Sequence, residues 1–203
     1  MTTWIWISGW AIAPDRFRSA VELAFPDDSH QVLAPTPEAL EVALNSKVDR
    51  IGGYSLGSLI LLSAFHRIPQ TAKVFCLAPF ISFCREDQLG GATQKATLTS
   101  LQQRLRKQPE KTLQLFYRLA GLDETLTTDL PYPIEHLEWG LEQLEKLKAD
   151  PNALNHVTAI AGLQDPLLDA NQMSAKGLNC AFVDQCNHNY QQLLVALSNL
   201  RDS

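Results

Sequence analysis

The chain has 203 residues, of which 45% are hydrophobic and 19% are charged, and its formal net charge at pH 7 is −5. This length and composition are typical of one globular domain with a single sizeable core. The acidic balance gives no reason to expect nucleic acid binding, and the sequence holds no apolar run of about 18 residues that would predict a membrane span.

The N-terminus and the cysteines bear on where the protein works. The first residues lack the basic region and the small-residue cleavage site of a signal peptide, so we interpret them as part of the folded protein. None of the four cysteines forms a C-x-x-C pair, and the apolar neighbours of Cys76 and Cys180 are typical of buried free thiols. These features predict a reducing compartment, with a cytoplasmic location as the default.

Short apolar runs that end at glycine or proline alternate with helical patterns in the first and last parts of the chain. The runs that we predict as strands are residues 4–7, 31–34, 48–53, 73–78, 157–161 and 179–183. The segments that we predict as helices are residues 15–23, 37–44, 56–65 and 190–200. The alternation and the apolar strands predict an α/β fold class, with a mostly parallel sheet of about six strands and helices on both faces.

The middle of the chain breaks this alternation. Its apolar residues recur at helical spacing, and we find no convincing strand there. We therefore predict a single domain with an insertion, in which a helical cap of residues 85–150 interrupts a core formed by residues 1–84 and 151–203.

The segment Gly53-Tyr54-Ser55-Leu56-Gly57 matches the pattern G-x-S-x-G and lies between a predicted strand and a predicted buried helix. On such a turn the serine adopts a strained backbone conformation, and the two glycines let strand and helix approach closely. The hydroxyl then projects above the sheet, and the helix N-terminus faces any anion that forms there. We predict Ser55 as a catalytic nucleophile; the alternative, a serine that only caps the helix, leaves the paired glycines unexplained.

A nucleophilic serine needs a base within hydrogen-bond reach, and the base needs an acid that orients it. For a serine on this kind of turn, the chain order is Ser, then Asp or Glu, then His. His188 is the predicted base, because it lies between the last predicted strand and the last predicted helix. Asp165, just past the strand at 157–161, is the predicted acid, and Asp169 is the alternative. A turn aspartate or a helix cap is the simpler role for either.

An oxyanion at the substrate carbonyl needs two backbone N–H donors. Leu56, directly after the nucleophile, is predicted to supply one, and Trp10, in the loop after the first strand, is predicted to supply the other. The Trp10 ring would also form a wall of the substrate pocket, and its alternative role is that of a core residue. No metal or cofactor is predicted, because no metal motif matches the spacing of the remaining histidines, His30, His66, His136 and His156.

On these residues the whole chain resembles the α/β-hydrolase superfamily, and within it the pimeloyl-[acyl-carrier-protein] methyl ester esterases of biotin synthesis. The matching segments are Ser8-Gly9-Trp10 (His-Gly-Trp in that family), Gly53–Gly57, Gly162-Leu163-Gln164-Asp165 and the loop around His188. Residues 101–105 and 140–144 resemble cap helices of the family. The sequence departs from the family at Ser8 and in lacking two N-terminal strands, which puts the substrate in doubt more than the chemistry.

The resemblance implies a carboxylesterase of the EC 3.1.1 type that hydrolyses a methyl ester at the end of an acyl chain carried on acyl-carrier protein. In this interpretation Leu101, Phe116 and Tyr117 line an acyl groove together with Trp10. A thioesterase or a small-molecule or lipid esterase is the enzymatic alternative, because the same site handles both ester types. A hydrolase-fold protein that binds a ligand without turnover is the alternative from a different class.

The charges of the predicted cap separate along the chain. Residues 95–118 carry six basic residues and one acidic residue, whereas residues 119–145 carry seven acidic residues and no basic one. A basic patch on an acidic protein favours an anionic partner, and acyl-carrier proteins are acidic. The predicted carrier-binding residues are Arg104, Lys107, Lys111 and Arg118. The alternative is a pair of solvated helix faces.

Overall fold

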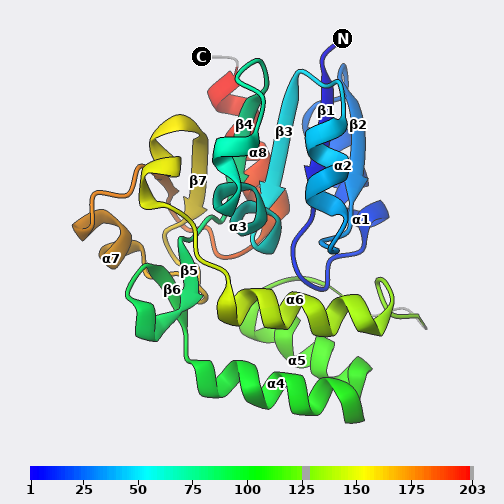
Figure 1. Cartoon of the computed structure of the whole chain (residues 1–203), viewed down its shortest axis with the longest axis vertical. Coiled ribbons are helices and arrows are strands. Elements are labelled where there is room, and N and C mark those ends of the chain that lie inside the picture. The colour runs from blue at the N-terminus through cyan, green and yellow to red at the C-terminus, as the bar shows by residue number, and fades with distance from the viewer. Residues whose placement is uncertain (125–128, 202–203) are drawn as a thin grey trace.

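A six-stranded, wholly parallel sheet forms the centre of the protein in a computed structural model that describes residues 1–124 and 129–201 (Figure 1). The strand order is β2-β1-β3-β4-β7-β8, and every pairing is parallel. The strands are β1 (Thr3–Ile7), β2 (Ser29–Leu33), β3 (Arg50–Tyr54), β4 (Lys73–Leu77), β7 (Thr158–Gly162) and β8 (Ala181–Val183). The predicted fold class and number of strands are therefore confirmed.

The burial of the strands follows their place in the sheet. In the central strands β1, β3, β4 and β7, every residue after the first is buried, because helices cover both faces. The edge strand β8 has no buried residue. This is why the central strands appear in the sequence as continuous apolar runs rather than as alternating ones.

Helices cover both faces of this sheet. The helices α2 and α3 pack on one face, and α1 and α8 pack against each other on the opposite face (Figure 1). The bounds of the helices beside the sheet are α1 (Pro14–Ala24), α2 (Ala39–Asn45), α3 (Leu56–Ser63), α7 (Ala170–Ala175) and α8 (Tyr190–Arg201). Short 3-10 helices span Phe65–Arg67, Arg85–Asp87 and Pro151–His156. The helix α3 is buried on every side over Leu56–Leu62, as its apolar composition predicts.

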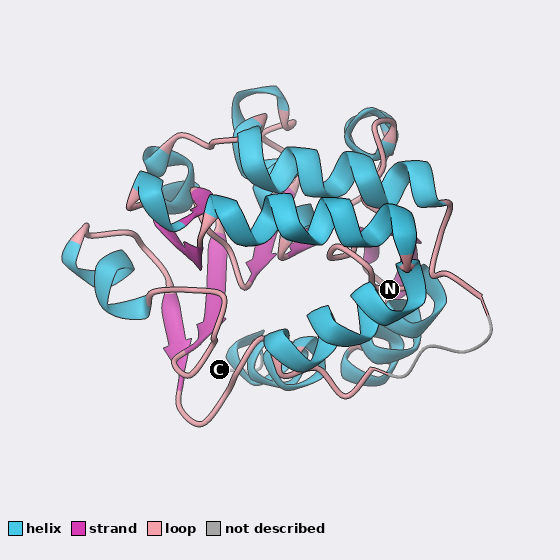
Figure 2. Cartoon of the chain, turned by 90° about the horizontal axis from the view of Figure 1, so that it is seen from below, coloured by secondary structure: helices cyan, strands magenta, loops and turns pink. Residues whose placement is uncertain are grey.

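Three helices lie beyond the carboxyl ends of the strands: α4 (Lys95–Lys107), α5 (Pro109–Ala120) and α6 (Ile134–Lys146). We call residues 95–146, which contain them, the α4–α6 segment. In Figure 1 the helix α6 lies between the sheet and α4, and Figure 2 shows the segment from its outer side. The carboxyl edge of the sheet, where side chains from several strands meet, therefore faces α6.

The prediction that residues 85–150 contain no strand is wrong at one point. Two short strands, β5 (Ser82–Cys84) and β6 (Gly90–Thr93), form a separate parallel pair. A Cβ at Gly91 would lie 2.1 Å from the Phe83 carbonyl oxygen, so only glycine allows this close approach. The pair escaped the prediction because a Gly-Gly start has neither an apolar run nor strand alternation.

A partly buried ion pair ties the residues that follow α5 to the core. The side chain of Glu124 is 7% exposed, and its Oε2 lies 2.5 Å from Nη1 of Arg16 on α1. The hydroxyl of Tyr190 on α8 donates to Glu124 Oε1 at 2.5 Å. Because both partners come from one face of the sheet, Glu124 ties the α4–α6 segment to the helices of that face.

All four cysteines are free thiols. Cys76 is buried, as predicted, and so are Cys84 and Cys186, whereas Cys180, which was also predicted to be buried, is only partly buried. Burial raises the pKa of the Cys76 thiol to about 12, so it stays protonated and acts as a small core residue. None of the helices that the structure describes combines the length and hydropathy that a membrane-spanning segment needs.

Candidate active site

Ser55 lies at a sharp turn between β3 and α3. Its φ of 54° and ψ of −112° place a non-glycine residue in a strained region of backbone space. A Cβ at Gly57 would lie 2.0 Å from the Ile7 carbonyl oxygen, and a Cβ at Gly53 would lie 2.7 Å from the Gly57 carbonyl carbon. Both glycines of the pattern are thus required by close packing, as the sequence predicts for this kind of turn.

The structure brings Ser55, His188 and Asp165 together, although they are far apart in the chain. His188 Nε2 lies 2.9 Å from Ser55 Oγ, and His188 Nδ1 lies 2.6 Å from Asp165 Oδ2. An ionised carboxylate only accepts hydrogen bonds, so a neutral His188 with its proton on Nδ1 donates to Asp165. Its Nε2 is then unprotonated and accepts the Ser55 hydroxyl. This arrangement places a hydroxyl, an imidazole and a carboxylate in one hydrogen-bonded series.

The three residues are almost fully buried. Relative exposure is 5% for Ser55, 1% for His188 and 6% for Asp165. In a poorly solvated setting, the interactions between the imidazole and the carboxylate are stronger than in water.

Asp165 has a second partner that fixes its orientation. Its Oδ1 accepts the backbone N–H of Leu167 at 2.8 Å, which leaves Oδ2 for His188. The alternative acid, Asp169, instead accepts the N–H of Gln172 at 2.9 Å and forms the N-cap of α7. The geometry therefore distinguishes Asp165, which contacts His188, from Asp169, which does not, a choice that the sequence left open.

The loop that carries His188 is held by contacts that the sequence analysis did not anticipate. The hydroxyl of Tyr54 donates to the His188 carbonyl oxygen at 2.6 Å. Burial raises the pKa of this tyrosine well above its usual range, so it remains a donor. Asn187 donates from Nδ2 to the Gly121 carbonyl oxygen at 3.0 Å and accepts the N–H of Asn189 at 2.9 Å. His188 is thus positioned through its main chain as well as through its ring.

The loop after β1 lies beside the turn that carries Ser55. A Cβ at Gly9 would lie 2.7 Å from the Tyr54 ring and 3.3 Å from Ser55 Cβ. Leu56 is the first residue of α3, so its N–H has no acceptor within that helix. The Trp10 N–H donates to no acceptor in the described chain. Both predicted donors are therefore left without an acceptor by the described bonds, and their contact with an oxyanion remains a prediction.

The predicted substrate-binding residues have different surroundings. The Trp10 ring is buried and meets the Phe116 ring edge to face at 4.7 Å. The Tyr117 hydroxyl donates to the Ala11 carbonyl oxygen at 2.6 Å, close to the predicted oxyanion donor. Leu101 lies on α4, which α6 separates from the sheet (Figure 1). A substrate contact by any of these residues remains a prediction.

The predicted carrier-binding residues are exposed on α4 and α5. Within the described chain, Arg104, Lys107, Lys111 and Arg118 form no ion pair closer than 4.0 Å. Their neighbour Arg106 instead pairs with Glu138 of α6 at 2.8 Å. The positive charge of this surface is therefore unneutralised at four positions.

No group of three or more His, Cys, Asp or Glu side chains in residues 1–124 and 129–201 is arranged to hold a metal ion. His30, the second residue of β2, illustrates a structural role. His30 Nδ1 accepts the indole N–H of Trp6 at 3.3 Å, and its Nε2 lies 3.0 Å from the Phe25 carbonyl oxygen.

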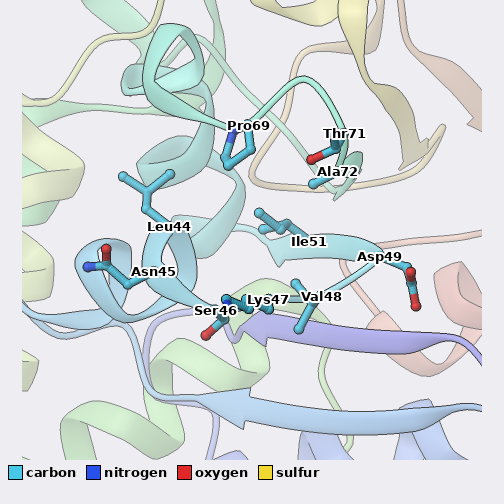
Figure 3. Close-up of a pocket in the computed structure, with 10 residues that line it drawn as sticks. All are labelled: Leu44, Asn45, Ser46, Lys47, Val48, Asp49, Ile51, Pro69, Thr71 and Ala72. Carbon is cyan, nitrogen blue, oxygen red and sulfur yellow. The ribbon is translucent and has the colours of Figure 1, made fainter.

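A cavity of about 530 Å³ lies at the opposite, amino-terminal edge of the sheet (Figure 3). It is lined by the end of α2, the residues that precede β3 and the turn before β4. Its carboxylate, Asp49, already accepts the N–H and the hydroxyl of Thr3 at 2.8 and 2.9 Å. No histidine or cysteine lines it.

Several residues that shape the site were missed by the sequence analysis. They are Tyr54, Asn187 and Tyr132, together with the hydroxyl of Tyr117. Tyr54 occupies a variable position of the G-x-S-x-G pattern, and Asn187 is one polar residue in a polar loop. Tyr132 carried the one usable signal, since prolines on both sides give it a rigid main chain.

No family model matches the sequence, and no curated protein matches it. Solved structures do match over nearly the whole chain. A hydrolase from Oleispira antarctica has a TM-score of 0.64 at 13% identity, covering 100% of this chain and 90% of its own. A thermophilic esterase from Thermogutta terrifontis has a TM-score of 0.62 at 11% identity, with coverage of 100% and 87%. A thioesterase of the prodiginine pathway in Streptomyces coelicolor has a TM-score of 0.56 at 15% identity, with coverage of 97% and 84%.

Proposed function

Given that the chain has an α/β-hydrolase fold, we propose that it is a serine hydrolase that cleaves carboxylic esters through an acyl-enzyme. Ser55 is the nucleophile, His188 the base, and Asp165 the group that orients the base. The observation that carries the proposal is the continuous hydrogen-bonded series from Ser55 Oγ through His188 to Asp165, at a strained turn between strand and helix.

In the first half of the reaction, His188 Nε2 takes the hydroxyl proton as Ser55 Oγ attacks the ester carbonyl. The resulting oxyanion accepts the backbone N–H groups of Leu56 and Trp10, while Asp165 stabilises the imidazolium. The carbon–oxygen bond to the alcohol then breaks, and the alcohol leaves with the proton from His188. An acyl group remains on Ser55.

In the second half, water takes the place of the alcohol. His188 accepts a proton from the water as its oxygen attacks the acyl carbonyl, and the same two N–H groups hold the second oxyanion. The bond to Ser55 Oγ breaks, the proton returns to the serine, and the carboxylic acid leaves. The residues named are sufficient for this cycle without a metal or cofactor.

Labelling with a fluorophosphonate tests the proposal, because its phosphorus bonds covalently to an activated serine oxygen and releases fluoride. We expect a single adduct on Ser55, located by peptide mass spectrometry, and its near-complete loss in His188→Ala. The other buried serines, such as Ser58, serve as controls within the same molecule. Failure to label Ser55, or equal labelling without His188, would instead favour a hydrolase-fold binding protein.

For the substrate, we propose an acyl chain carried on acyl-carrier protein, with a terminal methyl ester as in biotin synthesis. The exposed positive charges at Arg104, Lys107, Lys111 and Arg118 support an acidic carrier as the partner. A thioesterase is the second candidate, favoured by the structural similarity to the prodiginine-pathway thioesterase. A comparison of matched methyl ester and thioester substrates decides between them.

Charge reversal at Arg104, Lys107 and Lys111 to glutamate should lower kcat/KM for a carrier-linked ester by about tenfold or more at low salt. Hydrolysis of a small p-nitrophenyl ester should be unchanged, because these side chains are exposed on α4 and α5. A control triple, Lys47→Glu, Lys73→Glu and Lys176→Glu, changes the net charge equally at exposed positions elsewhere. Equal losses in both triples, or on both substrates, would argue against the carrier surface.

A further inference from the structure

The loop that carries the Trp10 donor contains a residue in an unfavourable backbone conformation. The N–H of Ile12 donates to the Gly9 carbonyl oxygen at 3.2 Å, so residues 9–12 form a β-turn. Ala11 is the third residue of this turn and has a φ of 64°, whereas Trp10 does not have a positive φ. This pattern matches a type II turn, in which the third position strongly favours glycine.

Two tyrosine hydroxyls from the α4–α6 segment hold Ala11 in this conformation. The Ala11 N–H donates to the Tyr132 hydroxyl oxygen at 2.7 Å, and the Tyr117 hydroxyl donates to the Ala11 carbonyl oxygen at 2.6 Å. Ala11, Tyr117 and Tyr132 are at most 8% exposed, so water does not compete for these bonds. Burial raises the pKa of both hydroxyls above the usual tyrosine range, and both stay protonated.

The side chain of Trp10 is held by the same segment. Its indole N–H donates to the Leu137 carbonyl oxygen of α6 at 2.8 Å. A Cβ at Gly140 would lie 2.6 Å from the Trp10 ring, so α6 packs directly on that ring. The α4–α6 segment thus fixes both the side chain of Trp10 and the main chain that follows it.

The bonds to Tyr117 and Tyr132 favour a type II turn at residues 9–12 over a type I turn. A type I turn suits alanine at the third position, and it differs from type II by a rotation of the peptide between the second and third residues. That rotation would turn the Ala11 N–H away from Tyr132 and would leave a buried donor unpaired, which is unfavourable. The tyrosines therefore select the turn that the sequence alone disfavours.

We propose that Tyr117 and Tyr132 are positioning residues, which hold Ala11 in its left-handed conformation and so fix the turn of residues 9–12 that carries the Trp10 N–H beside Ser55. This inference rests on the proposed ester hydrolysis. It also makes the oxyanion site dependent on the α4–α6 segment, because the core supplies one donor and the segment holds the turn that carries the other.

The variants Tyr117→Phe and Tyr132→Phe keep the rings and remove the hydroxyls. We expect kcat for a small p-nitrophenyl ester to fall about tenfold in each, with KM changed less than about threefold, because an oxyanion contact acts in the transition state. Thr112→Val is the matched control, since it removes a buried hydroxyl of α5 that donates to the Gln108 carbonyl oxygen. Its kcat should match that of the unaltered protein.

A rescue experiment separates positioning from a general packing role. Glycine adopts a positive φ without strain, so adding Ala11→Gly to Tyr132→Phe should restore kcat by about threefold or more. A loss of kcat that came only from a loosened α4–α6 segment would not respond to this change. Unchanged kcat in both tyrosine variants, or no rescue by Ala11→Gly, would overturn the inference.

Failure of this inference is distinguishable from failure of the proposed function. If Ser55→Ala abolishes turnover while both tyrosine variants keep full kcat, only the positioning role is wrong. If Ser55→Ala retains turnover, the ester hydrolysis by Ser55 is itself wrong. Thermal unfolding of each variant identifies any that does not fold. The comparison of Tyr132→Phe with the double variant Tyr132→Phe plus Ala11→Gly then decides on the positioning role.

Discussion

Replacing Ser55 with alanine lowers kcat for a short p-nitrophenyl ester by about 10⁴-fold or more, to the level that binding and the oxyanion donors alone support. The variant lacks the only oxygen that His188 Nε2 contacts among the bonds described above, so no acyl-enzyme forms. The fold should survive, because alanine fits the same turn and the glycines that pack around it are unchanged. Steady-state kinetics and thermal unfolding, measured on the same preparation, check both parts.

Ser58→Ala is the control for this variant. Ser58 lies one turn into the same helix, and its hydroxyl donates to the Leu77 carbonyl oxygen at 2.9 Å. Its removal should cost about 1 kcal/mol in the free energy of unfolding and leave kcat unchanged. Turnover in Ser55→Ala close to that of the unaltered protein would exclude Ser55 as the nucleophile.

Replacing Asp165 with asparagine is expected to lower kcat by about 10⁴-fold while leaving the volume of the side chain unchanged. The reason lies in the two partners of this carboxylate, the Leu167 N–H and the His188 Nδ1. An asparagine has one acceptor oxygen and one amide donor. If its oxygen accepts the Leu167 N–H, the amide faces His188 Nδ1, which must then lose its proton to Nε2. That tautomer cannot accept the Ser55 hydroxyl.

The opposite orientation of the asparagine amide is no better. It would keep the oxygen on His188 but would set the amide donor against the Leu167 N–H in a buried site. Asp169→Asn is the matched control, because asparagine caps a helix as well as aspartate does. Its kinetics should be unchanged. Comparable losses from both substitutions would show that the geometry does not identify the acid.

The layout of this fold follows from local signals that are strong in this sequence. The β1 and β4 strands are largely apolar runs that end just before a glycine or a proline, and such runs are typical of a parallel sheet. The turn at Ser55 needs glycine two residues before and two residues after it for steric reasons, so the sequence pattern predicts the turn directly. Chain order then places an acid and a base at the same edge of the sheet.

Other features could not be predicted, because they depend on contacts between distant segments. Tyr54 reaches the His188 carbonyl across 134 positions of the chain, and Tyr132 reaches Ala11 across 121. A tyrosine in a sequence gives no sign of which main-chain group its hydroxyl will meet. The choice between Asp165 and Asp169 was open for the same reason, since both follow the same strand and either could cap a helix.

The bonds from Gly121, Glu124 and Leu137 to the core bear on how the proposed enzyme could be re-engineered. Each of them ends on a loop or helix that flanks the reacting groups, at Asn187, at Arg16 with Tyr190, and at Trp10. Grafting a foreign segment in place of residues 95–146, to change the range of substrates, would therefore also remove contacts that hold Trp10 and the loop of His188. A working chimera therefore has to carry over both the new segment and the core residues that contact it.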